Sequence, residues 1–392
     1  SRTLVYRHGK PRQPTGKGSS VTYDPDLRRP TPLAIKLREE IRHRGPISIA
    51  EYMSRCLWDE AHGYYATQLV IGRDGDFITA AEISQTFGEI IGLWAGVVWQ
   101  QVLGAPKTVQ LVEYGPGRGT MMRDALRAAR VIPGLCEAAA VHLVEMSPEL
   151  IAAQRQALSD APVPIDWGHN LVGFSTPAII VANEFLDAWP VEQWIKTESG
   201  WRQRGVGLDS RGELSFVEMS QPSAGNGAAL RFPYAPLGAL VENQRLERLA
   251  EAFQSLARNG PITALIIDYG YATASAGDTL QAVGNHKYES PLTAPGEADL
   301  SAHVSFYELA SVLHSCGLAI DGPVTQAEFL GSLGIIERAS RLMHANPARA
   351  GEIETGIARL LAPNGMGTRF KAIGVRSPQL PPLPGFGVAR VT

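Results

Sequence analysis

Glycine and glutamate stand at strict two-residue spacing in the segment TVQLVEYGPGRGT, residues 108–120. An apolar run ends in Glu113, and Gly115, Gly117 and Gly119 follow before a helical pattern begins. Glycine lets the backbone turn tightly and lets a bulky ligand lie against it, so this loop predicts a cofactor-binding turn. A dinucleotide-binding loop has the spacing G-x-G-x-x-G, whereas the last glycine here comes one residue earlier. A glycine-rich turn that binds nothing is the competing interpretation.

This spacing, E-x-G-x-G-x-G, resembles the first motif of class I S-adenosylmethionine-dependent methyltransferases. In that family the acidic residue orders the loop or meets the methionine ammonium, and the glycines admit the amino-acid end of the cofactor. The resemblance therefore implies that Glu113, Gly115, Gly117 and Gly119 bind S-adenosylmethionine.

Polar side chains also follow the next two apolar runs, and ligands of an open parallel sheet bind at the carboxyl ends of its strands. Glu145 is placed to accept hydrogen bonds from both ribose hydroxyls, and Ser147 beside it caps the next helix. Asp166 and Trp167 end a short third run, where an adenine could stack on the indole and donate to the carboxylate. A solvent-facing glutamate, a capping aspartate and a core tryptophan are the alternatives.

The fourth run, AIIVANEFLD, delivers Asn183, Glu184 and Asp187 to the same edge of the sheet. Methyl transfer is an in-line displacement, so the enzyme must aim its nucleophile and often take a proton from it. A carboxylate can hold two parallel N–H groups of a guanidinium. We expect Glu184 to hold the acceptor, Asp187 to make a second contact or take the proton, and Asn183 to orient them. The alternative for Asn183 or Asp187 is a helix cap.

A fifth run ends in Asp268 and Tyr269, which we expect to line the acceptor pocket, with structural packing as the alternative. His286 and Asp299 lie in a glycine- and proline-rich stretch that would fold over the same mouth. His286 is included among the expected substrate-binding residues, although a loop histidine is more often a surface residue.

Strands and helices that alternate along the chain are expected to position these residues. Continuous apolar strands separated by helices predict an α/β class I methyltransferase (Rossmann-like) fold with a doubly wound, mostly parallel sheet. The expected strands are 108–114, 140–146, 164–167, 178–185, 262–270 and 370–376. The expected helices outside the 108–185 segment include 86–103, 237–258, 305–316 and 326–361.

The expected organisation has five parts. They are a flexible polar arm over 1–29, an N-terminal helical and lid region over 30–107, a cofactor-binding core over 108–190, an insertion of hairpins and a helix over 191–260, and completion of the sheet over 261–392. The last part carries an inserted loop at 276–304 and C-terminal helices.

Composition narrows the class of protein. The chain has 392 residues, a net charge of -3 and 44% hydrophobic residues, which are typical of an ordinary globular protein without a global field for nucleic acid. No apolar run approaches the ~18 residues that span a bilayer. Three distant cysteines and histidines without ligand spacing predict neither disulfides nor a metal site, and with no leader pattern we expect a cytoplasmic protein.

Eight motifs in order over residues 31–376 are together similar to the MidA-type methyltransferases, which include a mitochondrial assembly factor for respiratory complex I. The motifs are GYYAT, GDFITAAEIS, EYGPGRGT, LVEMSPEL, VANEFLDAWPV, IIDYG, APGEADLSAHVSF and TQAEFLGSLGI. The resemblance implies symmetric dimethylation of an arginine on a core subunit of complex I. It also implies a mitochondrial matrix location if the chain is eukaryotic.

Residue by residue, the resemblance assigns the NE-x-x-D motif to Asn183, Glu184 and Asp187. It also implies that GDFITAAEIS, with Asp76 and Thr79, forms a helical lid against the cofactor. His303 stands where some relatives carry an acidic residue, so that position has no assigned role.

Three other functions stay open at this point. A nicotinamide dehydrogenase is disfavoured by the short glycine spacing. A methyltransferase for a small molecule or another protein side chain is weakly disfavoured by the hairpin insertion, which suits a macromolecular acceptor. A non-catalytic cofactor-binding assembly factor is disfavoured because both Glu184 and Asp187 are present.

Overall fold

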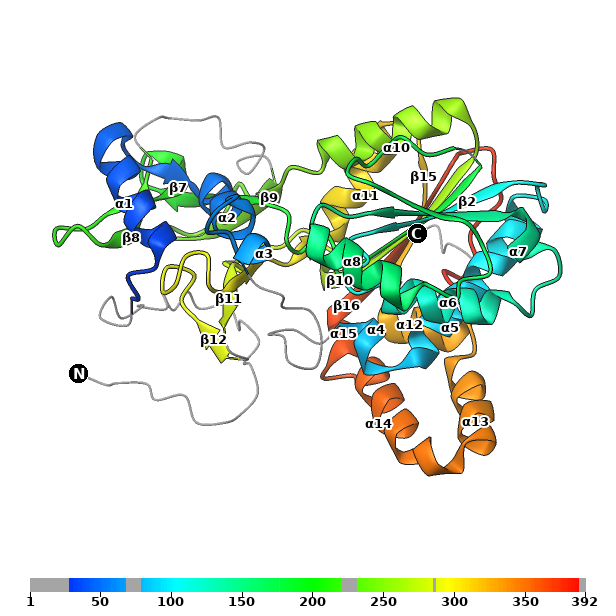
Figure 1. Cartoon of the computed structure of the whole chain (residues 1–392). Helices are drawn as coiled ribbons and strands as arrows, with labels where there is room; N and C mark the ends of the chain where they lie inside the picture. Colours follow the sequence, from blue (N-terminus) through cyan, green and yellow to red (C-terminus); the bar gives the residue numbers. More distant parts are fainter. Residues whose placement is uncertain (1–27, 68–78, 176, 220–230, 285–286, 388–392) are drawn as a thin grey trace.

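The computed structural model describes residues 28–67, 79–175, 177–219, 231–284 and 287–387. Figure 1 shows two lobes, a larger one built on the main sheet and a smaller one that holds the first helices and two further sheets. Segments distant in sequence build the smaller lobe, and one side of it faces the carboxyl ends of the main strands.

The larger lobe contains an eight-stranded sheet in the order β15-β16-β10-β5-β2-β3-β4, with β14 beside β10. Its strands are β2 (Val109–Tyr114), β3 (Ala139–Val144), β4 (Ile165–Gly168), β5 (Ala178–Asn183), β10 (Ile262–Tyr271), β14 (Val304–Ser305), β15 (Ala319–Thr325) and β16 (Phe370–Arg376). The pairs from β4 to β10 are parallel, and β16 runs antiparallel to both of its neighbours. This topology confirms the predicted doubly wound, mostly parallel sheet.

The chain moves outward from β2 to β4 on one side and from β5 to β10 on the other. The topological switch point therefore lies between β2 and β5, and ligands of such sheets bind in the crevice outside the carboxyl ends at this point. The glycine loop follows β2 and the NE-x-x-D motif begins at the end of β5, so the fold brings the two motifs to this crevice.

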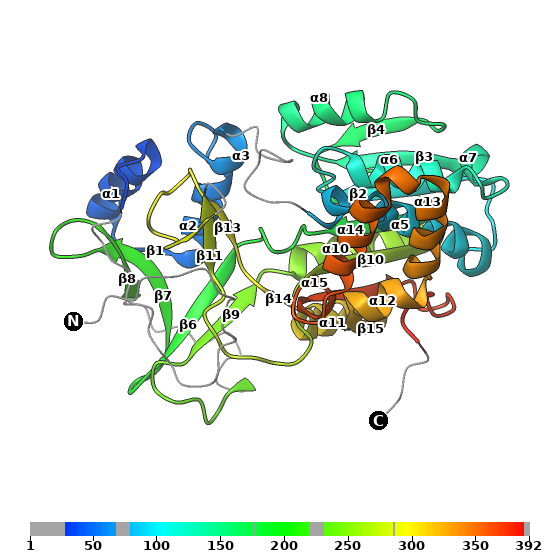
Figure 2. The ribbon, with the colours of Figure 1, turned by 90° about the horizontal axis from the view of Figure 1, so that it is seen from below.

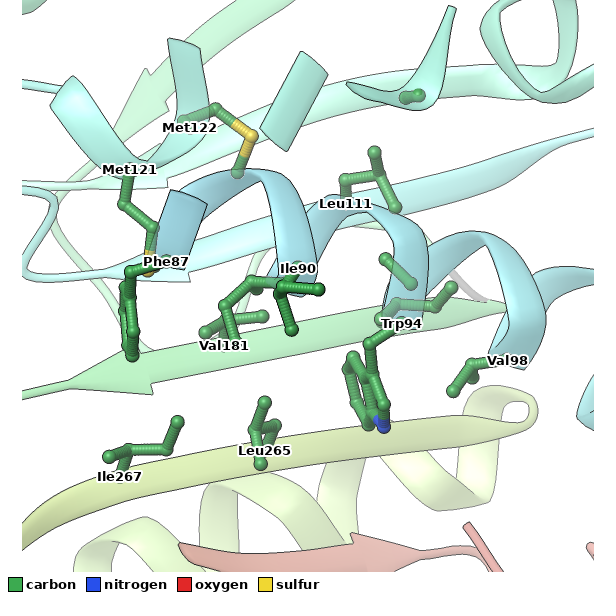
Figure 3. Close-up of a cluster of buried hydrophobic side chains, with 14 of the residues drawn as sticks. Phe87, Ile90, Trp94, Val98, Leu111, Met121, Met122, Val181, Leu265 and Ile267 are labelled. Atoms are coloured by element: carbon green, nitrogen blue, oxygen red, sulfur yellow. The ribbon is translucent and has the colours of Figure 1, made fainter. Parts of the chain in front are cut away.

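Helices cover both faces of the main sheet. On one face lie α5 (Gln85–Val97) with its π-helical extension η2 (Val98–Val102), α6 (Thr120–Ala129), α7 (Leu135–Ala138), α8 (Pro148–Ala157) and α12 (Gln326–Ser332). The other face carries α10 (Glu247–Asn259) and α11 (Phe306–Ser315). Figure 3 shows Phe87, Ile90 and Trp94 of α5 lying over Val181 and Leu265 of the sheet. These apolar faces follow the helical spacing read from the sequence.

A helical hairpin projects from the same lobe. It consists of α13 (Ile335–Ala345), the short η4 (Pro347–Arg349) and α14 (Ala350–Leu361), followed by α15 (Met366–Arg369). Figure 1 shows α13 and α14 side by side below the sheet. The sequence predicted helices over 326–361, and Gly334 in the left-handed region and Pro347 mark the divisions between α12, α13 and α14.

The smaller lobe packs helices against two small sheets (Figure 2). Its helices are α1 (Pro32–Arg44), α2 (Ile49–Trp58) and α3 (Tyr64–Thr67). Its antiparallel strands are β1 (Ile47–Ser48), β6 (Val191–Thr197), β7 (Gly200–Leu208), β8 (Leu214–Glu218) and β9 (Leu240–Gln244), with β11 (Gln281–Gly284), β12 (Lys287–Glu289) and β13 (Asp299–Ser301) in the other sheet. The hairpin insertion, the N-terminal helices and the inserted loop thus share one core.

The strands that were not predicted include β9 and β15. Residues 240–244 were expected to begin a helix, yet they form β9 because they pair with β6, and the periodic face of α10 starts only at Leu246. The segment AIDGPVT was not recognised as β15 because Gly322 and Pro323 interrupt it. A proline is tolerated there because β15 is an edge strand with an irregular register between Asp321 and Val324.

Candidate active site

The glycine loop turns sharply where β2 ends. Gly115, Gly117 and Gly119 all have positive φ, at 61°, 54° and 79°, where a side chain would be strained. A Cβ on Gly115 would lie 2.8 Å from the ring of Phe185 in the NE-x-x-D turn. The two motifs therefore touch, and glycine is needed both for the turn and for this close approach.

Glu113 lies at the base of this loop with a buried side chain. Its Oε2 has no hydrogen-bond partner within the described part of the chain. Burial raises its pKa to about 8, since a charged carboxylate is poorly solvated there. An unpaired buried acceptor fits a cationic or hydrogen-bonding group of a ligand, such as the ammonium of a bound amino acid.

Glu145 follows β3 and is held by the start of α8. Its Oε1 accepts from the amides of Met146 and Ser147 at 2.8 and 2.9 Å. The Ser147 hydroxyl in turn accepts from Leu150 N and caps α8, as predicted from its Ser-Pro sequence. Burial raises the pKa of Glu145, and the two amides oppose the rise. The carboxylate is thus fixed at the edge where a ribose would lie.

Gln154 of α8 joins three parts of this edge and was not identified from the sequence. Its Nε2 donates to Gly117 O at 2.7 Å and reaches Glu145 Oε2 at 3.3 Å. Its Oε1 accepts from Trp167 Nε1 at 2.9 Å. A fully buried glutamine with every group engaged sets the relative positions of the loop and the carboxylate.

Asp166 and Trp167 lie on opposite faces of β4, because successive strand residues alternate. Asp166 Oδ2 lies 2.7 Å from His142 Nδ1, although most of its side chain is exposed. Arg155 stacks over the Trp167 ring at 4.1 Å from its centroid. Their expected contacts with an adenine stay a prediction.

Glu184 has a left-handed backbone, with φ of 50°, at the end of β5. Such a conformation is uncommon and costly for a residue with a side chain, and it is found most often at functional sites. Its Oε1 accepts from Ala80 N at 2.7 Å. Burial raises its pKa to about 7, and the Asp187 carboxylate adds to the rise while Ala80 opposes it.

Asp268 holds the turn that carries Glu184 and Asp187. Its fully buried Oδ2 accepts from the amides of Phe185, Leu186 and Asp187 at 3.1, 2.9 and 3.2 Å. Burial and the two neighbouring carboxylates raise its pKa, and its backbone donors oppose the rise. The geometry gives Asp268 a structural contact, one of the two alternatives expected for it.

Asp187 lies beside the phenol of Tyr269. Burial raises the pKa of Asp187 to about 6, while a hydrogen bond from the Tyr269 side chain lowers it. The ring of Tyr269 packs edge-on against His303 and Phe370, with centroids 5.4 and 5.5 Å apart. The Asn183 amide lies beside Glu184, with Nδ2 3.4 Å from Glu184 Oε1 and Oδ1 buried without a partner among the described residues.

The helix α4 (Ala80–Ile83) contacts both the turn that carries Glu184 and the start of α6. Ala80 N is bound by Glu184, and Glu82 Oε1 accepts from Thr120 Oγ1 at 2.6 Å at the start of α6. Thr79 is its N-cap residue but makes no side-chain capping bond. The expected contact between Thr79 and a cofactor stays a prediction, and Asp76 and His286 lie outside the described residues.

No cluster of three or more histidine, cysteine or acidic side chains able to hold a metal ion is found in the part of the chain that the structure describes. No helix there is long and apolar enough to cross a membrane.

A doubly wound sheet with a glycine loop at its switch point, a buried carboxylate after the next strand and further carboxylates at the end of β5 defines a nucleoside-cofactor enzyme of the class I methyltransferase type. The unpaired acceptor of Glu113 fits a cofactor that carries an ammonium group.

Comparison with known proteins identifies the family: the profile of the S-adenosyl-L-methionine-dependent methyltransferase family Methyltransf_28 matches residues 90–324, and the chain belongs to this family. The family relation sets aside a nicotinamide dehydrogenase. The chain is 36% identical over 381 residues to the mitochondrial protein arginine methyltransferase NDUFAF7 homolog of Drosophila melanogaster, covering 88% of this chain and 84% of that protein. It is 32% identical over 395 residues to NDUFAF7 of Homo sapiens, covering 91% and 86%.

A solved structure resembles the whole molecule. It is a COG1565 superfamily member from Burkholderia thailandensis bound to S-adenosyl-homocysteine, with 26% identity and a TM-score of 0.77 over 88% of this chain and 91% of that chain. This likeness and the family confirm the predicted class I methyltransferase fold and S-adenosylmethionine as cofactor.

Proposed function

We propose that this chain transfers methyl groups to a guanidinium nitrogen of an arginine in a partner protein. Support comes from relatives at 32–36% identity that are named protein arginine methyltransferases. The observation that carries the proposal is the pair of carboxylates, Glu184 and Asp187, on a turn that touches the glycine loop. When bound, S-adenosylmethionine supplies an electrophilic methyl on its sulfonium.

Glu113 would pair with the ammonium of the cofactor and Glu145 with its ribose hydroxyls. Glu113 has a free acceptor for this purpose, and the fixed Glu145 carboxylate lies at the end of β3. Gly117 would allow the amino-acid end to approach the backbone. The residues of the crevice therefore fit the cofactor that the family uses.

Glu184 would hold two guanidinium N–H groups and draw positive charge away from the attacking nitrogen. During transfer the carbon–sulfur bond breaks, its electron pair stays on sulfur, and the new nitrogen–carbon bond forms. Asp187 would then accept the proton that the methylated nitrogen loses. Asn183, with a buried unpaired Oδ1, would orient a donor of the acceptor. The raised pKa values of the two carboxylates, about 7 and about 6, suit proton acceptance near neutral pH.

The finer parts of the proposal are a symmetric dimethylated product and an acceptor on a core subunit of respiratory complex I. They follow the resemblance to the MidA-type family. The reaction would take place where that complex is assembled, which is the cytoplasm or, in a eukaryote, the mitochondrial matrix.

The test is mass spectrometry of respiratory-complex preparations from cells with and without this chain. The proposal expects an arginine methylation that disappears with the chain and returns with the wild-type protein, but not with Glu184→Gln. If arginine methylation is unchanged and methylation of another residue type is lost, that residue type and not arginine is the acceptor.

A further inference from the structure

We infer that Tyr65 and Asp299 of the smaller lobe complete the acceptor site, with the Tyr65 ring stacking on the guanidinium plane and Asp299 facing Asp187 across it. This inference rests on the proposed arginine acceptor. It adds two residues that lie outside the main sheet, and it gives the smaller lobe a direct part in acceptor recognition.

The position of α3 carries the first step. In both Figure 1 and Figure 2, α3 lies on the side of the smaller lobe that faces the main sheet. Tyr65 in α3 stacks on Trp58 at the end of α2, with centroids 4.5 Å apart and planes inclined by 29°. It also meets Tyr64 edge-on at 5.4 Å. These contacts hold the Tyr65 ring in one orientation.

The Tyr65 side chain packs against the apolar cluster of the smaller lobe that contains Leu300 and Ala302, and Ala188, next to Asp187, packs against the same cluster. Burial raises the pKa of Tyr65, and the charges of Asp299, Asp187 and Glu145 raise it further, in that order. Tyr65 therefore lies near the turn that carries Asp187, the carboxylate expected at the acceptor. A residue in this place would meet the group that receives the methyl.

A backbone hydrogen bond ties the end of β13 to the turn that carries Glu184 and Asp187. Ala302 N, next to the end of β13, donates to Asp187 O at 2.9 Å. Tyr269 bridges the same two segments, since its side chain is hydrogen-bonded to Ser301 and to Asp187. Asp299 thus stands on a strand that is fixed relative to Asp187.

An aromatic ring beside two carboxylates, here Tyr65 with Asp187 and Asp299, favours a planar cation as ligand. Guanidinium stacks on aromatic faces and pairs with carboxylates in its own plane, whereas an ammonium is a compact point charge. Asn183 provides independent evidence for a ligand, because its Oδ1 is buried beside Glu184 and has no partner among the described residues. A donor of the acceptor would satisfy it.

Direct binding tests the inference. N-acetyl-arginine amide is titrated by NMR into the protein saturated with S-adenosylhomocysteine, with N-acetyl-citrulline amide as the neutral isostere and N-acetyl-lysine amide as the compact cation. Arginine should bind more tightly than both. Tyr65→Ala should weaken arginine binding about three- to thirtyfold, the range of a cation–π contact, and Asp299→Asn should also weaken it.

Tyr65→Phe keeps the ring, so it should bind arginine within about twofold of wild type. Matched controls are Tyr288→Phe and Asp160→Asn, whose side chains are exposed and which should change nothing. Affinity for S-adenosylhomocysteine, measured by calorimetry, should be retained in all variants and reports folding.

The outcomes separate this inference from the proposed function. Preferential arginine binding that Tyr65→Ala and Asp299→Asn leave unchanged overturns the inference and leaves the arginine acceptor standing. Equal binding of arginine and citrulline, or tighter binding of lysine, overturns both. Preferential binding that is lost in Tyr65→Ala and kept in Tyr65→Phe supports the stacking contact.

Discussion

Replacing Glu113 by glutamine keeps the shape of the side chain and removes its charge. In the cofactor-free protein, burial raises the pKa of this carboxyl from 4.5 to about 8. A raised carboxyl pKa favours the folded state at low pH, where the group is neutral in both states. The free energy of unfolding falls as pH rises from 4.5 toward 8, because over this range the carboxyl ionises in the unfolded chain while it stays protonated in the folded protein.

The size of this effect follows from the interval between the two values. At roughly 1.4 kcal/mol per pKa unit, wild type would lose up to about 5 kcal/mol of unfolding free energy between pH 4.5 and 8 that Glu113→Gln does not lose. The melting temperature of Glu113→Gln minus that of wild type should therefore rise steadily over this range. At pH 8 the affinity of Glu113→Gln for the cofactor should be about ten- to a hundredfold lower than that of wild type, because the variant lacks a charged hydrogen bond.

Thermal scans from pH 5 to 9, with and without S-adenosylhomocysteine, measure both effects. Glu137→Gln is the control, since Glu137 is exposed on α7 and should show no pH-dependent difference. A melting difference that does not grow with pH would refute the buried, neutral Glu113. Unchanged affinity in Glu113→Gln would refute its contact with the ammonium.

Gly117→Val should abolish cofactor binding in calorimetry, because a branched side chain would be strained at φ 54° and would fill the cofactor's space; normal affinity would contradict the loop assignment. Glu184→Gln should keep cofactor affinity and lower turnover about 10²-fold or more in a radiolabel transfer assay, and unchanged turnover would move the acceptor contact elsewhere. In wild type, kcat/KM should fall as pH drops through about 7 and about 6, where Glu184 and Asp187 take up protons. Tyr269→Phe removes a hydrogen bond that lowers the pKa of Asp187, so the acid limb should move to higher pH, and an unmoved limb would show that Asp187 does not act as base.

The fold was largely predictable because its strands are continuous apolar runs and its helices have periodic faces. The glycine loop and Ser147 were also predictable, since positive φ and helix capping each demand particular residue types at one position. β9 was missed because its pairing with β6 comes from a distant part of the chain. The glycine and proline within β15 indicate a break unless its place at the sheet edge is known.

The site was predictable only where side chains follow strands of the main sheet. Gln154 lies on a helix face and has no sequence signal, since its role depends on Gly117, Glu145 and Trp167 meeting around it. The position of Tyr65 is set by the packing of the smaller lobe, which no local pattern encodes. The left-handed backbone of Glu184 could not be predicted from the sequence either, because the residue at that position is not a glycine.

A crystal structure of the protein with S-adenosylhomocysteine would locate the cofactor relative to these carboxylates. We expect the ribose hydroxyls to contact Glu145, the ammonium to contact Glu113, and the sulfur to face the turn that carries Glu184 and Asp187. A nucleoside bound outside the crevice between β2 and β5, or a sulfur directed away from those two carboxylates, would contradict this expectation.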